Sequence, residues 1–221
     1  MPRCLRFPVL LLLFALLAAG CSGGDEELPE GAQLLTRSAD SMSTVRTVRL
    51  DLDVEGTVGG FSVQGASAQV TREGDAAGTA TLGQGGQVTE LEFVFTGGTL
   101  YLQGPTGGFQ KVPAALASSV YDPTVILDPQ NGIPALLRRG NGAVTEAREE
   151  VGGVGAYRVR ATFPGAVLSG LVPNLEQDTS GLVWIGVDEP RLVQARFPLP
   201  NGTATVRLSD FDAPANITAP Q

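Results

Sequence analysis

Residues 48–55, Val48-Arg49-Leu50-Asp51-Leu52-Asp53-Val54-Glu55, decide the fold of this chain. Every even position in this segment is apolar and every odd position is charged. Successive side chains of a β-strand point to opposite faces, so this alternation predicts a strand with one buried and one solvated face. Such a strand is typical of an antiparallel sheet, which needs a covering layer on only one side.

Similar segments follow this strand along the chain, separated by glycine-rich turns. The chain has 29 Gly and 15 Pro among its 221 residues, which suits a fold with many turns. We expect further strands at residues 61–72, 76–82, 88–95, 100–103, 109–112, 143–150, 156–163, 182–187, 192–197 and 203–208. The pattern therefore predicts one long antiparallel meander that short helices interrupt, first at residues 113–139.

Short helices are expected to cover the apolar face of the sheet. Apolar side chains recur at helical spacing in residues 33–43 and 164–175. Asp122-Pro123 and Asp128-Pro129 each place an Asp before a Pro, which favours a helix start, so a short helix is expected after each pair.

The predicted fold class is α+β: a curved antiparallel β-sheet (a half-barrel) covering a few short helices, with an apolar cavity between the layers. The strands often carry Ala or Gly where a filled core needs larger side chains, and such a composition permits a cavity without requiring one. A tightly curled, filled barrel is the alternative.

The first 20 residues have the features of a bacterial lipoprotein signal peptide. Arg3 and Arg6 precede an apolar run of 13 residues, 7–19, which is too short to span a bilayer of about 30 Å. Cys21 follows Leu17-Ala18-Ala19-Gly20, which resembles a lipobox, although Ala18 stands where Leu is usual. An ordinary signal peptide with an incidental cysteine is the alternative. We expect Cys21 to carry a diacylglyceryl anchor in the cell membrane, on the extracytoplasmic (periplasmic) side.

The rest of the chain divides into three parts in this interpretation. Residues 21–32 contain the lipidated cysteine and a flexible tether, residues 33–212 form a single β half-barrel domain, and residues 213–221 form a polar tail. The net charge of −8 and the pI near 4.6 argue against binding to nucleic acid.

Composition also argues against an enzyme. The chain has no His, and its two Cys, Cys4 and Cys21, lie in the signal region, so no catalytic residue, metal site or cofactor is predicted. Asp51, Asp53 and Glu55 offer a possible calcium site, but a solvated strand face explains them better. Glu90/Glu92 and Asp210/Asp212 could in principle act as paired carboxylates in glycoside hydrolysis, but a solvated strand face explains them better as well. Arg138-Arg139 suits either an anionic headgroup or the C-terminus of a helix.

Three further segments resemble a known family. Residues 120–133 read VYDPTVILDPQNGI, and residues 182–185 and 192–195 read LVWI and LVQA. Together with the lipobox and the helix-then-strand opening, they resemble the mycobacterial LprG/LppX lipoprotein family (LppX_LprAFG) over essentially the whole mature chain.

This resemblance implies a carrier of multiply acylated lipids or glycolipids from the cytoplasmic membrane toward the outer, mycolate layer of an actinobacterium. It implies a lipid-binding domain with an apolar cavity, and we expect a monomer that acts with a multi-pass exporter. An anchored, non-catalytic scaffold or exporter subunit with a filled core is the alternative. The predicted strand wall of the cavity consists of Val48, Leu50, Leu52, Val54, Ala80, Leu82, Leu91, Phe93 and Phe95. The predicted helical wall consists of Val125, Ile126, Ile133, Leu137, Val167, Leu168 and Leu171.

Overall fold

The structure is a computed structural model that describes residues 27–56, 62–84, 87–105, 107–112, 123–172 and 175–221. The predicted signal peptide, Cys21 and the Tyr121-Asp122 part of the family signature lie outside these described residues. Within them, no helix is both long and apolar enough to cross a lipid bilayer.

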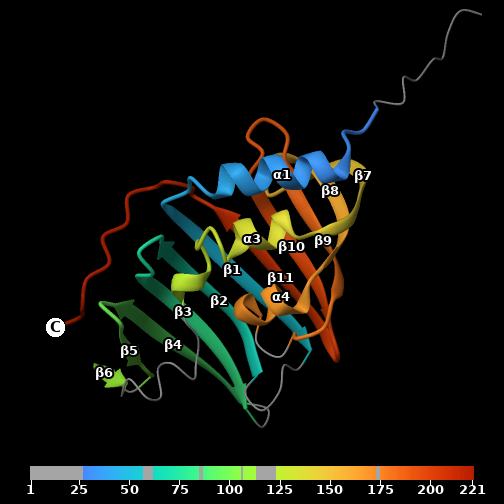
Figure 1. Ribbon diagram of the computed structural model, residues 1–221. Helices are drawn as coiled ribbons and strands as arrows, with labels where there is room; N and C mark the ends of the chain where they lie inside the picture. Colours follow the sequence, from blue (N-terminus) through green and yellow to red (C-terminus); the bar gives the residue numbers. More distant parts are fainter. Residues whose placement is uncertain (1–26, 57–61, 85–86, 106, 113–122, 173–174) are drawn as a thin grey trace, which may run out of the picture.

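Eleven strands form one antiparallel sheet in the order β6-β5-β4-β3-β2-β1-β11-β10-β9-β8-β7 (Figure 1). The strands are β1 (Thr47–Gly56), β2 (Ser62–Thr71), β3 (Ala76–Gln84), β4 (Gln87–Thr96), β5 (Thr99–Gln103), β6 (Phe109–Val112), β7 (Asn141–Val151), β8 (Val154–Phe163), β9 (Thr179–Gly186), β10 (Leu192–Leu199) and β11 (Gly202–Ser209). Strands β6 and β7 stand at the two ends of this order, so the sheet is open, and it is not strongly curled, which departs from the predicted half-barrel. The prediction of a large antiparallel sheet with few helices is therefore confirmed in outline.

The first and last strands pair in the middle of the sheet. Strand β1 pairs with β11 from Arg49↔Ser209 to Gly56↔Gly202 and with β2 on its other side. The sheet thus consists of two meanders, β1–β6 and β7–β11, joined along β1 and β11. Helices η1 and α3 lie between β6 and β7 in the chain, so the helical interruption that the sequence predicts separates these two meanders.

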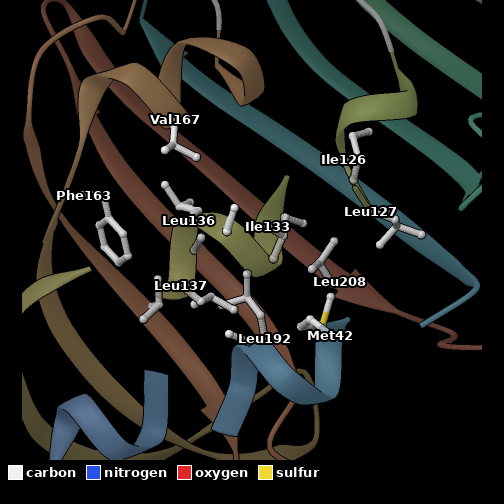
Figure 2. Close-up of a cluster of buried hydrophobic side chains, with 14 of the residues drawn as sticks. Met42, Ile126, Leu127, Ile133, Leu136, Leu137, Phe163, Val167, Leu192 and Leu208 are labelled. Atoms are coloured by element: carbon white, nitrogen blue, oxygen red, sulfur yellow. The ribbon is translucent and has the colours of Figure 1, made fainter. Parts of the chain in front are cut away.

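The helices lie over one face of the sheet, which we call the inner face (Figure 1). They are α1 (Gly31–Met42), the 3-10 helix η1 (Pro123–Val125), α3 (Ile133–Arg138) and α4 (Gly165–Leu171). Side chains of these helices and of the inner face form one buried cluster that includes Met42, Leu137 and Phe163 (Figure 2). The opposite face of the sheet is the outer face.

The prediction that a helix starts at Asp128-Pro129 is wrong. Helix α3 begins only at Ile133. The Asp128 carboxylate instead accepts the backbone N–H groups of Gln130 and Asn131, at 2.8 and 2.7 Å, and forms a turn. Pro134 explains the late start, because proline is tolerated in the first turn of a helix and disrupts a helix interior.

Two of the other expected helices are shorter than predicted. After Pro123 the chain forms only the single turn of η1, since the residue before Pro129 is disfavoured in helical conformation. Helix α4 ends at Leu171, whereas the prediction ran to Leu175. Val172 is extended because a proline follows it in the sequence. The helical layer therefore contains shorter helices than the sequence predicts.

Candidate functional site

The strand register decides which side chains share the inner face. Directly paired residues of an antiparallel sheet lie on the same face, so Leu50, Ala68, Gly78, Phe93 and Leu102 form one transverse row across β1–β5. A second row consists of Leu52, Ala66, Ala80 and Leu91. Both rows are entirely apolar. The alternation in residues 48–55 therefore places its even positions on the inner face, as predicted.

Burial decreases from one row to the next along the strands, in the direction away from α1. Val48 has no exposed surface, whereas Leu50, Leu52 and Val54, further along β1, are all partly exposed. The neighbouring strands show the same trend, because Val70 and Ala76 are buried while the next rows are mostly half-buried. We call the partly exposed set the open apolar face; it comprises Leu50, Leu52, Val54, Ala66, Ala80, Leu82, Leu91, Phe93 and Leu102.

The middle of the open apolar face is built from small side chains. Ala66 and Ala80 are paired across β2 and β3, between Leu52 on β1 and Leu91 on β4. With strands 4.7–4.9 Å apart, the two flanking leucine strands are separated by about 14 Å. This row therefore has large side chains on its flanks and a strip of small ones, Ala66 and Ala80, between them; we call this strip the trough.

A glycine on the same strands is required by backbone packing. A Cβ added at Gly78 would lie 2.0 Å from the carbonyl oxygen of Ser67 and 2.7 Å from the Cα of Ala68. Real Cβ atoms do not approach other atoms so closely, so no larger residue fits without a shift of β2. Close strand packing at Gly78 and the small side chains of Ala66 and Ala80 thus both keep large side chains out of this part of the inner face.

The predicted strand wall divides into two groups. Leu52, Val54, Ala80, Leu82 and Leu91 are partly exposed and lie outside the buried cluster. Val48 is fully buried within that cluster, and Leu50, Phe93 and Phe95 pack against its margin. The structure therefore brings all nine strand residues to the inner face, but it leaves chiefly the end remote from α1 accessible.

The predicted helical wall is mostly packed core. Ile126, Ile133, Leu137 and Val167 are buried in the cluster (Figure 2). Leu168 is also buried in it, and Leu171 packs against its edge. Val125 is partly exposed. Leu137 and Leu168 have no exposed surface, so in this conformation they contact only protein atoms.

Several inner-face residues were missed by the sequence interpretation. Ala66, Ala68 and Leu102 lie in the two rows described above, and Val206 of β11 pairs with Leu52. Their signal was present as a period of two in β2, β5 and β11. The small size of the alanines and the unknown pairing of β11 hid it.

The charged groups near this region lie on the other side of the sheet. Asp51, Asp53 and Glu55 alternate with the inner-face residues of β1, and the last two are exposed. Across residues 27–221, apart from the gaps given above, no three His, Cys, Asp or Glu side chains come together to hold a metal ion. The open apolar face thus offers apolar contact and no charged group.

A separate ion-pair cluster lies on the outer face of β7 and β8. Arg160 contacts the Glu146 carboxylate at 2.5 Å, and Arg158 contacts it at 3.2 Å. The hydrogen bond from Arg160 is the largest cause that holds the pKa of Glu146 below its usual value of 4.5; partial burial opposes it, and the charges of both arginines and the hydrogen bond from Arg158 add to the lowering. Arg158 also pairs with Glu149 at 3.0 Å. This cluster faces away from the open apolar face and has no part in it.

Sequence comparison finds relatives over nearly the whole chain. Residues 30–217 match the LppX_LprAFG lipoprotein family. The chain is 34% identical over 221 residues to the lipoarabinomannan carrier protein LprG of Mycolicibacterium smegmatis, which covers 96% of this chain and 93% of that protein. The protein of the same name from Mycobacterium leprae is 28% identical over 229 residues, with 95% of both chains covered.

Structural comparison finds the same architecture in two solved proteins. The crystal structure of LprF from Mycobacterium bovis matches with a TM-score of 0.78 and 24% identity, over 86% of this chain and 96% of that chain. The crystal structure of the lipoprotein LppX from Mycobacterium tuberculosis matches with a TM-score of 0.64 and 17% identity, over 85% and 97% of the two chains. These similarities show that the large sheet with helices on one face is a shared fold.

Proposed function

The chain belongs to the LppX_LprAFG lipoprotein family, and on this premise we propose that it binds acylated lipids or glycolipids between its sheet and its helices and carries them across the periplasmic space. As a member of a family of carrier lipoproteins, it is non-catalytic. The two relatives named LprG are lipoarabinomannan carrier proteins, which supports a glycolipid as the ligand class.

The observation that carries this proposal is the open apolar face. An ordinary core would bury Leu52, Leu82 and Leu91 completely, because each leucine left in water forfeits about 1.5–3 kcal/mol of transfer free energy. Here all three are partly exposed on the face that the helices cover. An acyl chain placed in the trough over Ala66 and Ala80 would complete their burial.

The energetics explain why such a lipid needs a carrier. Exposing one chain of about 16 carbons to water costs about 13 kcal/mol at about 0.8 kcal/mol per CH₂ group. Two or three chains on one molecule would not cross an aqueous gap unaided. A cavity between the inner face and the helices would shield them while a sugar headgroup stays in water.

The location proposed for this activity is the extracytoplasmic side of the cell membrane. We propose that residues 1–20 are removed, that Cys21 holds the diacylglyceryl anchor, and that the protein acts as a monomer supplied by a multi-pass exporter. Two acyl chains on the anchor are sufficient for stable membrane attachment, whereas one chain is marginal.

Native mass spectrometry of the full chain, purified from an actinobacterial host in mild detergent, tests the carrier function. We expect co-purified acyl lipids of defined mass that are released on unfolding. Protein that is consistently free of such lipids, and that does not take up acylated glycolipid from vesicles, would contradict the proposal. That result would instead favour an anchored scaffold or exporter subunit.

A further inference from the structure

Helix α1 buries a polar group that has no partner. Ser38 has no exposed surface, and its hydroxyl oxygen is the single buried side-chain N or O atom among the described residues without a hydrogen bond. Its helical neighbours Leu34, Ala39 and Met42 belong to the apolar cluster. A buried hydroxyl without a partner loses its hydration without compensation, so it weakens the contact between α1 and the layer beneath it.

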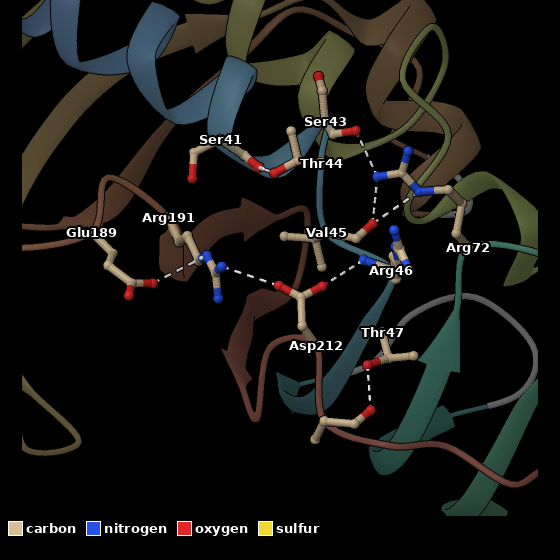
Figure 3. A network of polar contacts seen from close by, with 11 residues as sticks. Ser41, Ser43, Thr44, Val45, Arg46, Thr47, Arg72, Glu189, Arg191 and Asp212 are labelled. Atoms are coloured by element: carbon tan, nitrogen blue, oxygen red, sulfur yellow. Dashed lines mark hydrogen bonds and ion pairs between the residues drawn. The ribbon is translucent and has the colours of Figure 1, made fainter.

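The C-terminal end of α1 is fixed from two sides (Figure 3). On one side, Arg72 donates to the carbonyl oxygens of Ser43 and Val45, at 2.6 and 2.9 Å. On the other side, the Asp212 carboxylate accepts the backbone N–H of Arg46 at 2.8 Å. These contacts bind the junction between α1 and β1 to the end of β2 and to the segment after β11.

Two more contacts strengthen this attachment. The Thr47 hydroxyl donates to the Ala213 carbonyl at 2.6 Å, and Arg191 pairs with Asp212 at 3.0 Å. Asp212 has a φ of 60°, a left-handed conformation that costs energy in a residue other than glycine, and it persists because its side chain and backbone are both bonded. The junction at residues 43–47 is thus a firm attachment point.

The N-terminal end of α1 is attached differently. Gly31 lies directly against β7, where a Cβ would be 2.8 Å from the backbone carbonyl of Ala143. The Thr145 hydroxyl donates to the Pro29 carbonyl at 2.5 Å. The chain before Pro29 continues into the tether predicted from the sequence. The N-terminal end of α1 is therefore in close backbone contact with β7, and it is also the end to which a membrane anchor would be connected.

We propose that α1 is a hinged flap, which pivots about residues 43–47 and lifts at its N-terminal end. Ser38 makes the closed position reversible, because its hydroxyl is dehydrated when α1 is closed and hydrated when α1 lifts. Helix α1 packs mainly on α3 and also contacts β7 and β9, so lifting uncovers apolar surface on α3 and on the inner face at β7 and β9. The role of this motion in lipid entry rests on the proposed function; the motion itself does not.

Hydrogen exchange of the lipidated full chain in vesicles tests the flap. In the wild type, we expect the amides of α1 to exchange as one group and faster than those of β9. Ser38→Ala removes the uncompensated hydroxyl, so the exchange of α1 should slow about tenfold, equivalent to about 1.4 kcal/mol. Transfer of a fluorescent diacyl lipid between vesicles should slow by a similar factor. Ser41→Ala, on the same helix but at a partly exposed position, should change neither rate.

A second variant acts in the opposite direction. Thr145→Ala removes the hydrogen bond to Pro29, so the first half of α1 should exchange faster. Exchange of α1 amides only together with those of β9 would overturn the proposal, since α1 would then open only by global unfolding. An unchanged lipid transfer rate in Ser38→Ala, with slowed exchange of α1, would overturn its role in lipid entry. Absence of bound lipid would contradict the carrier function, and the exchange data would still decide whether the flap exists.

Discussion

Filling the trough on the inner face should remove lipid binding without unfolding the protein. Ala80 lies in the trough between Leu52 and Leu91, and it is partly exposed, so a larger side chain has room to point into the space above the sheet. In Ala80→Trp, the indole would occupy the position that we assign to an acyl chain. The variant therefore tests the location of the site directly.

The size of the effect follows from the area that the indole covers. A tryptophan side chain buries about 150–250 Å², and apolar contact is worth about 25 cal/mol per Å². Displacing a similar area of acyl chain should therefore cost about 4–6 kcal/mol of binding free energy. At 1.4 kcal/mol per factor of ten, lipid affinity should fall by about three orders of magnitude or more.

Native mass spectrometry and titration with a fluorescent acyl lipid would measure this loss. Thr81→Trp is the matched control, because Thr81 is the next residue of β3 and its side chain points to the outer face. Both variants should retain a cooperative thermal transition. Equal lipid loads in Ala80→Trp and the wild type, or an equal loss in Thr81→Trp, would refute our assignment of the inner face as the binding surface.

Three other changes test separate parts of the interpretation. Gly78→Ala should destabilise the protein by about 1–3 kcal/mol in urea unfolding, because its Cβ would overlap the Ser67 carbonyl, 2.0 Å away. Wild-type stability of Gly78→Ala would mean that β2 and β3 can separate at this position without cost. Glu146→Gln should lower stability at neutral pH. Because the pKa of Glu146 is lowered from 4.5 by Arg160, the carboxylate stabilises the folded state above that value and loses this effect as the pH falls through the lowered pKa. The two proteins should therefore converge in acid, and a constant difference would exclude this ion pair as the cause. Cys21→Ser should release the protein from the membrane fraction on cell fractionation, and retention there would exclude the cysteine as the anchor.

The sequence was sufficient to predict the strands because their signal is local. The alternation of Val48 to Glu55 requires no knowledge of the neighbouring strands, and it correctly predicts which face of β1 is apolar. Strand order is a different matter. The pairing of Leu52 with Val206 joins residues far apart in the chain, and no local pattern predicts which two strands meet in the middle of the sheet.

The helical layer was predicted less well because two local signals compete in it. Asp128-Pro129 has the features of a helix start, but Pro134 moves the start to Ile133. The sequence also could not predict which residues of the expected lining are packed in the core and which are partly exposed. Leu137 and Leu82 are both apolar and both lie between the layers, yet only the number of covering atoms distinguishes them.

Partial exposure has a physical advantage for a carrier that must also release its ligand. Complete burial of three chains of about 16 carbons would yield nearly 40 kcal/mol, about twice the practical limit on non-covalent affinity. A ligand held that tightly would never leave. On the open apolar face, Leu52 and Leu91 flank a floor of Ala66 and Ala80, and small side chains give the ligand fewer contacts per unit length than a leucine-lined wall would. The same alanines that leave this face unfilled in the free protein would therefore limit its affinity when loaded, and enlarging them should slow release before it prevents binding. Ala66→Val tests this reasoning: we expect slower transfer of lipid to acceptor vesicles at an unchanged lipid load, and faster transfer would show that contact with the trough does not control release.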